Sequence, residues 1–374
     1  MNGQDERYMA MALRLAERGM NTTRPNPRVG CVLVKDGEIV GEGWHERAGE
    51  PHAEIHALNQ AGDKAKGAVA YVSLEPCCHQ GRTGPCSQAL IQAGVRRVVA
   101  AMLDPNPKVA GQGLAQLHQA GVETLHGLLQ AQAEELNTGF IFRMRHGRPR
   151  ITCKLAVSLD GHTAMANGES QWITSEPARL DVHMLRARSC AILTGVGTIL
   201  SDDPSLTVRL PDWDPEFQPL RVIMDSQLQT PPNARCLALP GRTLILTLGA
   251  GSDKQRVLER AGAEIVALPA DAQGRVDLST AMSHLGRLEI NELMVEAGAA
   301  LNGALLESGL MDQCVIYVAP HFMGSQTRPM LETPALGTMA DRVQLDIKEW
   351  RAVGRDWRIT AVPEVEPKKN AMRN

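Results

Sequence analysis

The sequence predicts an α/β protein with two domains. The chain has 374 residues, which is more than a single hydrophobic core usually serves. Apolar segments typical of strands alternate with amphipathic segments typical of helices, which is the pattern of a layered α/β sheet. The polar segment RHGRPR (145–150) interrupts this alternation once. We therefore expect one domain over residues 1–146 and a second over 147–374, with about the last twelve residues frayed.

The first half opens with an expected helix and an expected hairpin. Apolar residues recur on one helical face of residues 5–18, and Gly19 ends the pattern. Asp36-Gly37 stands between two apolar runs, as in a tight β-hairpin. Helices and strands then alternate. The expected helices are 53–61, 86–93, 111–120 and 129–145, and the expected strands are 68–75, 96–102 and 122–125.

The second half contains a longer α/β series. Its expected strands are 151–157, 190–194, 220–225, 243–248, 264–267, 291–296 and 313–319. Its expected helices are 176–188, 252–261, 278–286 and 300–308. Ser175 stands at the N-cap position of the first of these helices. Residues 343–362 are expected to form a closing β-hairpin.

Composition and charge argue against several partners. The formal net charge is -3 and only 3% of residues are aromatic, so no basic field or aromatic platform favours nucleic acid. No window of about 18 apolar residues indicates a membrane span. The charged N-terminal segment lacks the apolar core of a signal peptide. Cysteines such as Cys153 and Cys314 lie in apolar runs, which is typical of buried thiols in a reducing compartment. We expect a cytoplasmic protein without nucleic-acid or membrane partners.

Residues of the metal-ligand type gather in the first half. The segment EPCCHQGRTGPC (75–86) holds three cysteines and one histidine, and His52 stands at the start of an expected helix. His52, Cys77 and Cys86 together offer one imidazole and two thiolates. Three protein ligands leave a fourth position open, which is the arrangement of catalytic zinc sites.

Glu54 favours a catalytic site over a structural one. A closed structural site would need a fourth ligand, which Cys78 or His79 could supply. However, His-x-Glu followed by Pro-Cys and a later Cys is the signature of zinc-dependent nucleobase deaminases. Zinc lowers the pKa of bound water, and a nearby carboxylate that is not a ligand can move the protons. Glu54 is in the position for this role.

Glycines follow two expected strands in the second half. GVGTILSDDPSLTVR (195–209) follows the expected strand 190–194, and glycines there could let the backbone approach a phosphate. In the segment 291–309, Gly298 and Gly303 flank a helix start whose free N–H groups would suit a pyrophosphate. Glu296 ends the preceding strand and is directed to the same place. Tight turns are the structural alternative for these glycines.

The motifs of both halves resemble one known family. EPCCHQGRTGPC and NPRVG (26–30), with the long spacing between the two cysteine ligands, are similar to the deaminase domain of the bifunctional riboflavin-biosynthesis deaminase/reductases. SLDG, GESQWIT, GVGT, DDPSLTVR and VEAG occur in the order found in the reductase half. The resemblance covers roughly residues 5–360. It implies a cytidine-deaminase-like α/β/α layered sheet followed by a dihydrofolate-reductase-like α/β domain.

The resemblance also implies site residues. In the deaminase domain it implies the zinc ligands His52, Cys77 and Cys86, the catalytic Glu54, and Asn26, His79 and Arg82 on the substrate side. The implied NADPH site comprises Ala156, Trp172, Thr198, Asp202, Gly298, Ala299, Ala300, Leu301, Asn302, Gly303 and Ala304. The implied substrate site comprises Ser170, Arg186, Leu206, Arg209 and Glu296, and Lys154 and Asp160 also match family positions. Arg186 and Arg209 would suit a phosphate clamp, and Asp202 is a candidate proton donor.

The implied function is two consecutive steps of riboflavin biosynthesis. The first is zinc-dependent hydrolytic deamination of 2,5-diamino-6-(5-phosphoribosylamino)pyrimidin-4(3H)-one. The second is NADPH-dependent reduction of the ribosyl side chain to give 5-amino-6-(5-phosphoribitylamino)uracil. The family also suggests a homodimer or homotetramer. Two alternatives stay open: a tRNA-type base deaminase with an accessory nucleotide-binding domain, and a structural zinc module joined to a nucleotide-binding regulator.

Overall fold

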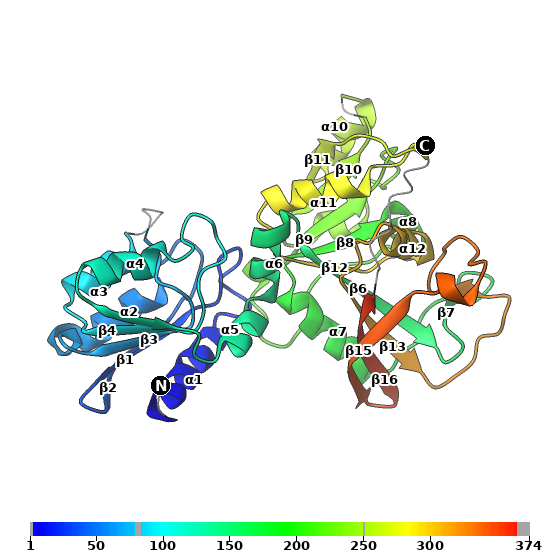
Figure 1. Cartoon of the computed structure of the whole chain (residues 1–374). Helices are drawn as coiled ribbons and strands as arrows, with labels where there is room; N and C mark the ends of the chain where they lie inside the picture. The colour runs from blue at the N-terminus through cyan, green and yellow to red at the C-terminus, as the bar shows by residue number, and fades with distance from the viewer. Residues whose placement is uncertain (1–2, 79–83, 250, 365–374) are drawn as a thin grey trace, which may run out of the picture. The chain divides into compact units, whose positions relative to one another are not determined.

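The computed structural model of the chain describes residues 3–78, 84–249 and 251–364. The chain forms two compact units, Met1–Arg148 and Pro149–Asn374. Each unit has its own mixed α/β sheet (Figure 1), which confirms the predicted α/β class. None of the helices in the described ranges is long and apolar enough to cross a membrane.

The sheet of the first unit has the strand order β2-β1-β3-β4-β5. The strands are β1 (Gly30–Lys35), β2 (Glu38–Trp44), β3 (Val69–Val72), β4 (Arg97–Ala100) and β5 (Glu123–His126). β1 pairs antiparallel with β2 and β3, and β4 pairs parallel with β3 and β5. The predicted hairpin is confirmed: Asp36 and Gly37 both have positive φ, as the tight turn between twisted strands requires.

Helices cover both faces of this sheet. On one face lie α1 (Gly3–Glu17), α5 (Gln130–Leu136) and α6 (Thr138–His146), which bury Met9, Ala133 and Phe140 against the strands. On the other lie α2 (Ala53–Ala61), α3 (Cys86–Gln92) and α4 (Gln112–Gln119), which bury Ala57, Leu90 and Leu117 against Leu33 and its neighbours. A 3-10 turn (Gly62–Ala65) follows α2. The unit is therefore an α/β/α sandwich.

The single helix predicted over 129–145 is wrong, because Asn137 separates α5 from α6. Asn137 is buried, and its side-chain amide bonds both backbone groups of Arg28: Oδ1 accepts from the N–H at 2.8 Å and Nδ2 donates to the carbonyl at 3.0 Å. Its φ of -115° lies outside the helical region. A tertiary hydrogen-bonded pair thus overrides the local helical pattern.

The second unit has a nine-stranded sheet in the order β11-β10-β9-β8-β12-β6-β13-β16-β15. The strands are β6 (Arg150–Ser158), β8 (Ala191–Gly195), β9 (Leu220–Met224), β10 (Thr243–Thr247), β11 (Ala263–Ala267), β12 (Glu292–Val295), β13 (Gln313–Ala319), β15 (Gln344–Val353) and β16 (Asp356–Glu364). All neighbours from β11 to β13 pair parallel, and β16 and β15 pair antiparallel. A separate ribbon joins β7 (His162–Ala164) to β14 (Arg328–Pro329).

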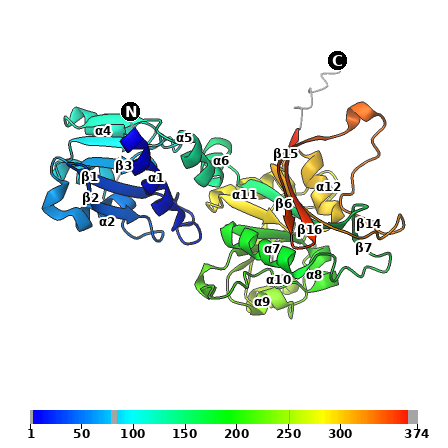
Figure 2. The same cartoon turned by 90° about the horizontal axis from the view of Figure 1, so that it is seen from below.

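Helices again lie on both faces of the sheet (Figure 2). One face carries α7 (Glu176–Arg188), α8 (Val196–Asp202), α9 (Arg235–Ala238) and α10 (Asp253–Arg260), and the other carries α11 (Leu278–Arg287) and α12 (Ala299–Glu307). Short 3-10 turns lie at Pro215–Phe217 and Met339–Asp341. The sequence did not predict α8. Ser175 occupies the predicted N-cap position, yet its hydroxyl donates to Asp356 Oδ2 at 2.6 Å and so links α7 to β16.

The separate cores predict separate responses to mutation. Leu33 is fully buried in the first unit, so Leu33→Ala should destabilise that unit by about 2–5 kcal/mol. Native-state hydrogen exchange of peptides should show lost protection in β1, β3 and β4 and unchanged protection in β6, β8 and β12. The matched control, Leu293→Ala in β12, should give the reverse pattern. Equal losses in both units after either change would contradict the independence of the cores.

Candidate active sites

The first site is the cluster of predicted metal ligands. His52 immediately precedes α2, Cys77 follows β3, and Cys86 is the first residue of α3. The structure brings the three together: His52 Nδ1 lies 3.6 Å from Cys77 Sγ and 3.3 Å from Cys86 Sγ. The three ligand atoms all lie within 4.8 Å of one another. The backbone N–H of Cys86 also donates to Cys77 Sγ at 3.3 Å.

Both distances from His52 Nδ1 are close to the ligand spacings around a zinc ion. Two ligands at about 2.0–2.3 Å from one ion in tetrahedral geometry are separated by roughly 3.5–3.8 Å, close to the observed spacings. The donor set of one imidazole and two thiols suits zinc and leaves one tetrahedral position open. The hydrogen bond between the two sulfurs lowers the pKa of the Cys77 thiol to about 4 and raises that of Cys86, so one of the two is readily a thiolate. Cys78 lies outside this group and contacts the Lys108 carbonyl at 3.7 Å.

Glu54, the residue expected to move protons, is buried in the first turn of α2. Its side chain is only 3% exposed, and Oε2 has no hydrogen-bond partner among the described residues. Burial raises the pKa of this carboxyl to about 7. A buried carboxyl oxygen without a partner costs free energy, so it indicates a missing ligand or water. A carboxyl group with such a pKa can exchange a proton near neutral pH.

His45 is a site residue that the sequence did not reveal. It directly follows β2, which ends at Trp44, and is 2% exposed. Its Nδ1 lies 3.2 Å from the Pro51 carbonyl, which accepts only, so Nδ1 carries the proton and Nε2 accepts from Asn26 Nδ2 at 3.0 Å. Its ring also packs edge-on against His52. His45 thus holds the predicted substrate residue Asn26 next to the metal ligand. His79 and Arg82 lie outside the described residues, so their roles stay predictions.

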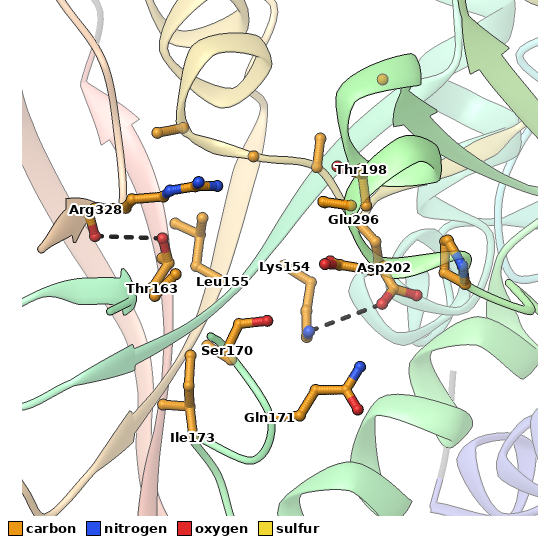
Figure 3. Close-up of a pocket in the computed structure, with 18 of the residues that line it drawn as sticks. Lys154, Leu155, Thr163, Ser170, Gln171, Ile173, Thr198, Asp202, Glu296 and Arg328 are labelled. Atoms are coloured by element: carbon orange, nitrogen blue, oxygen red, sulfur yellow. Dashed lines mark hydrogen bonds and ion pairs between the residues drawn. The ribbon is translucent and has the colours of Figure 1, made fainter. Parts of the chain in front are cut away.

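The second site is a cavity of about 730 Å³ in the second unit (Figure 3). It opens at the carboxyl ends of β6, β8 and β12, where ligands bind in open α/β sheets. Fourteen predicted residues line it: Lys154, Ala156, Ser170, Trp172, Arg186, Thr198, Asp202, Leu206, Arg209, Glu296, Gly298, Ala299, Ala300 and Leu301. The sequence analysis did not single out Arg179, His183 and Arg328, which also line the cavity.

Four predicted residues lie outside the cavity lining. Asn302, Gly303 and Ala304 lie further along α12. A Cβ on Gly303 would lie 1.8 Å from the Glu332 carbonyl oxygen, so this glycine permits a close backbone contact. Asp160 instead accepts hydrogen bonds from the N–H groups of Met323 and Gly324. It joins the β6–β7 turn to the loop after β13.

Three charged side chains form the floor of the cavity. Arg186 binds Glu296 through two hydrogen bonds, Nε to Oε1 at 2.5 Å and Nη2 to Oε2 at 2.9 Å, and donates its Nη1 to the Thr207 carbonyl. Lys154 Nζ lies 3.8 Å from Glu296 Oε2 and points to it in Figure 3. Burial raises the pKa of Glu296, but Arg186 and Lys154 together outweigh burial and lower it to about 2.

Arg186 and Arg209 differ in their freedom to bind a phosphate. Each nitrogen of the Arg186 guanidinium is already bonded within the protein, so in this structure Arg186 orients Glu296. Arg209 is exposed at the cavity wall, and its guanidinium donates to Thr207 Oγ1 at 3.1 Å. The phosphate role expected for both arginines is therefore better suited to Arg209.

Comparisons with known proteins agree over almost the whole chain. The RibD C-terminal domain family matches residues 149–359, and the cytidine and deoxycytidylate deaminase zinc-binding region matches residues 2–102. Riboflavin biosynthesis protein RibD of Escherichia coli (strain K12) is 53% identical, covering 94% of this chain and 98% of that protein. The chain belongs to the RibD family. It is an enzyme of riboflavin biosynthesis with a deaminase and a reductase step.

Other members of the RibD family show the same relationship. The Haemophilus influenzae protein is 47% identical, with 97% of this chain and 98% of that protein covered. A solved structure of Acinetobacter baumannii RibD has a TM-score of 0.89 at 41% identity, with 96% and 99% coverage. A Thermotoga maritima structure, a diaminohydroxyphosphoribosylaminopyrimidine deaminase/5-amino-6-(5-phosphoribosylamino)uracil reductase, has a TM-score of 0.84 at 29% identity, with 96% and 99% coverage.

The charged floor of the cavity predicts a pH-dependent stability difference. Arg186→Met leaves the Glu296 carboxylate with Lys154 alone and should destabilise the second unit by about 3–5 kcal/mol near neutral pH. The pKa of Glu296 is lowered from 4.5 to about 2 in the folded protein. The Arg186–Glu296 ion pair therefore stabilises the folded state fully above pH 4.5, and this stabilisation is lost as the pH falls towards 2. The difference in the free energy of unfolding between wild type and Arg186→Met should therefore be smaller at about pH 3 than at about pH 7. Denaturant unfolding at both pH values measures it.

Arg242→Met is the matched control for this change. Arg242 also forms two hydrogen bonds with a glutamate, Glu264, but both side chains are exposed. An exposed pair contributes about 0–1 kcal/mol. Equal effects of the two variants, or a deficit of Arg186→Met that does not change with pH, would refute the role given to burial.

Proposed function

We propose that the first unit deaminates 2,5-diamino-6-(5-phosphoribosylamino)pyrimidin-4(3H)-one with zinc, and that the second unit then reduces the ribosyl chain with NADPH to give 5-amino-6-(5-phosphoribitylamino)uracil. The observation that carries the first step is the three-ligand cluster beside the unpartnered oxygen of Glu54. Both steps are also supported by the likeness to the T. maritima deaminase/reductase. We assign the deamination to residues 1–146 and the reduction to residues 147–374, a division that lies two residues before the boundary between the compact units.

In the deaminase step, His52, Cys77 and Cys86 would hold the zinc ion, which supplies the Lewis acidity that makes water a nucleophile near neutral pH. Glu54 would accept a proton through its unpartnered oxygen and return it to the ring nitrogen and the departing amine. Water replaces the amino group with a carbonyl, and ammonia leaves. Asn26, oriented by His45, would position the pyrimidine.

In the reductase step, the cavity would bind cofactor and substrate side by side. NADPH supplies a hydride when bound. The free N–H groups at the start of α12, where Gly298, Ala299 and Ala300 line the cavity, suit its pyrophosphate. Glu296 and Arg209 would contact the sugar and phosphate of the substrate. Transfer of this hydride to C1′ of the opened sugar would require a residue of the chain to deliver a proton to the developing negative charge.

Lys154 is better placed than Asp202 to deliver this proton. Asp202 is exposed at the end of α8. The Lys154 side chain is only 18% exposed and lines the cavity beside Glu296. Burial lowers the pKa of its ammonium group, which makes proton release easier. We therefore assign the donor role to Lys154 in place of Asp202.

The remaining predictions concern assembly and location. We infer a homodimer or homotetramer in the cytoplasm, which light scattering and cell fractionation would test. No specific observation favours the tRNA-type base deaminase, and the match of both halves to one family supports the small phosphorylated pyrimidine instead.

The direct test is incubation of the purified protein with the diaminopyrimidine ribosyl phosphate, with and without NADPH, followed by mass spectrometry. Without NADPH, the expected product has lost an amine and gained a carbonyl oxygen. With NADPH, it also gains two hydrogens. An unchanged substrate under both conditions would contradict the proposal.

Two substitutions in the metal site should have different effects on zinc content and deamination rate. Glu54→Gln should retain one zinc ion per chain and lose about 10²–10⁴-fold in deamination rate, since a proton carrier is lost and the ligands remain. Cys86→Ser should lose both zinc and deamination while NADPH binding survives. Elemental analysis, deamination rates and NADPH fluorescence measure these properties. Full activity of Glu54→Gln with zinc bound would rule out its catalytic role.

Replacement of Arg209 in the cavity wall should weaken binding of the phosphorylated substrate. Arg209→Ala removes a charged group from the proposed phosphate position, and such hydrogen bonds contribute about 1.5–3 kcal/mol. The reductase KM for the phosphorylated substrate should rise by about 10- to 100-fold. The KM for NADPH serves as the internal control and should stay constant. An unchanged substrate KM would remove Arg209 from the phosphate site.

A further inference from the structure

A buried carboxylate whose two oxygens both accept backbone hydrogen bonds lies two residues before the metal ligand Cys77. Glu75 is 3% exposed, and four backbone N–H groups donate to its side chain. Oε2 accepts from Asp104 at 3.1 Å and from Gly111 at 2.8 Å, and Oε1 accepts from Gly113 at 2.9 Å and from Leu114 at 3.1 Å. No step of the proposed reaction uses this group.

These bonds fasten the metal-ligand segment to α4. Gly113 and Leu114 lie in the first turn of α4, whose N–H groups have no partner within the helix and favour an anion. The two segments also touch directly, because a Cβ on Gly113 would lie 2.0 Å from the Pro76 carbonyl oxygen. Glu75 therefore fixes where the chain leaves β3 on its way to Cys77.

A second set of contacts holds Cys77 from the other side. The backbone N–H of Ser87 donates to the Cys77 carbonyl at 3.1 Å, and the Ser87 hydroxyl lies 3.0 Å from the same oxygen. The Ser87 hydroxyl also lies 2.5 Å from Gln116 Oε1 of α4. The backbone on both sides of the Cys77 thiol is thus tied, directly or through Ser87, to one helix.

We propose that Glu75 is a positioning residue for the metal site: its bonds to residues 104–114 hold Cys77 at the spacing from His52 and Cys86 that zinc requires. The inference rests on the proposed role of Cys77 as a zinc ligand. Residues that orient metal ligands typically change metal affinity by about 10- to 100-fold when they are replaced. Glu75 contacts none of the three ligand atoms in the bonds described above, so its effect would pass through the backbone.

The test is the zinc affinity of Glu75→Gln, measured by competition with a chromophoric chelator. Glutamine has the same shape, but its NH₂ group would face two of the four backbone donors, which leaves them unsatisfied. We expect zinc binding weakened by about 10- to 100-fold and NADPH-dependent reduction unchanged. Unchanged hydrogen-exchange protection of β1, β3 and β4 shows that the first unit of the variant is folded, and intact reduction shows the same for the second unit.

Asp225→Asn is the matched control. Asp225 is fully buried in the second unit and accepts hydrogen bonds from the N–H groups of Gln229 and Thr230 and from the Thr230 hydroxyl. The change removes the same type of carboxylate far along the chain from the metal ligands. Zinc affinity should remain at the wild-type value. An equal loss in Asp225→Asn would show that zinc affinity responds to the loss of any buried carboxylate of the chain, and would overturn the inference.

Gly113→Ala provides a second variant if Glu75→Gln does not fold. The added methyl group would push against the Pro76 carbonyl and displace Cys77 while all the carboxylate groups remain. Zinc binding should again weaken. Wild-type zinc affinity in the folded variant overturns the role of Glu75. A wild-type protein that binds no zinc would instead refute the proposed function itself, so the two failures can be told apart.

Discussion

A carboxylate taken out of water must find hydrogen bonds or opposite charges, and both sites depend on how this constraint is met. Glu75 accepts hydrogen bonds from four backbone N–H groups. Glu296 forms ion pairs with the two cationic side chains of Lys154 and Arg186. Within the part of the chain that the structure describes, Glu54 Oε2 has no hydrogen-bond partner. We propose that Glu75 holds structure in place, that Glu296 also contacts the substrate, and that the unpartnered oxygen of Glu54 takes part in the chemistry. Buried titratable groups of this kind are candidates for functional roles.

Topology brings these groups together. In the first unit, β3 ends just before the segment with Cys77, while His52 and Cys86 stand at the starts of helices on one face of the sheet. In the second unit, parallel strands deliver Lys154, Gly195 and Glu296 to one edge, where α8 and α12 begin. The same layered arrangement therefore supports two unrelated reactions, because the loops at the strand ends differ.

Local patterns were sufficient for most elements and for naming the three side chains that the structure brings together, His52, Cys77 and Cys86. The Asp36-Gly37 turn, the alternation of strands and helices, and the His-x-Glu and cysteine motifs all depend on neighbours in sequence. Features that depend on distant partners were missed. Asn137 breaks a helix because of Arg28, His45 matters because Pro51 and Asn26 fix its ring, and Arg186 is occupied because Glu296 lies beside it. No periodicity or spacing encodes such pairings.

The charged lining of the reductase cavity has a consequence for ligand capture. The wall contains five basic side chains (Lys154, Arg179, Arg186, Arg209 and Arg328) and three acidic ones (Asp202, Glu296 and Glu332). The chain as a whole carries a formal charge of -3, so this concave surface opposes the overall field. Low-dielectric walls focus such a local potential and speed the arrival of ions of opposite sign. Encounter with a phosphorylated molecule would then slow as salt shortens the screening length.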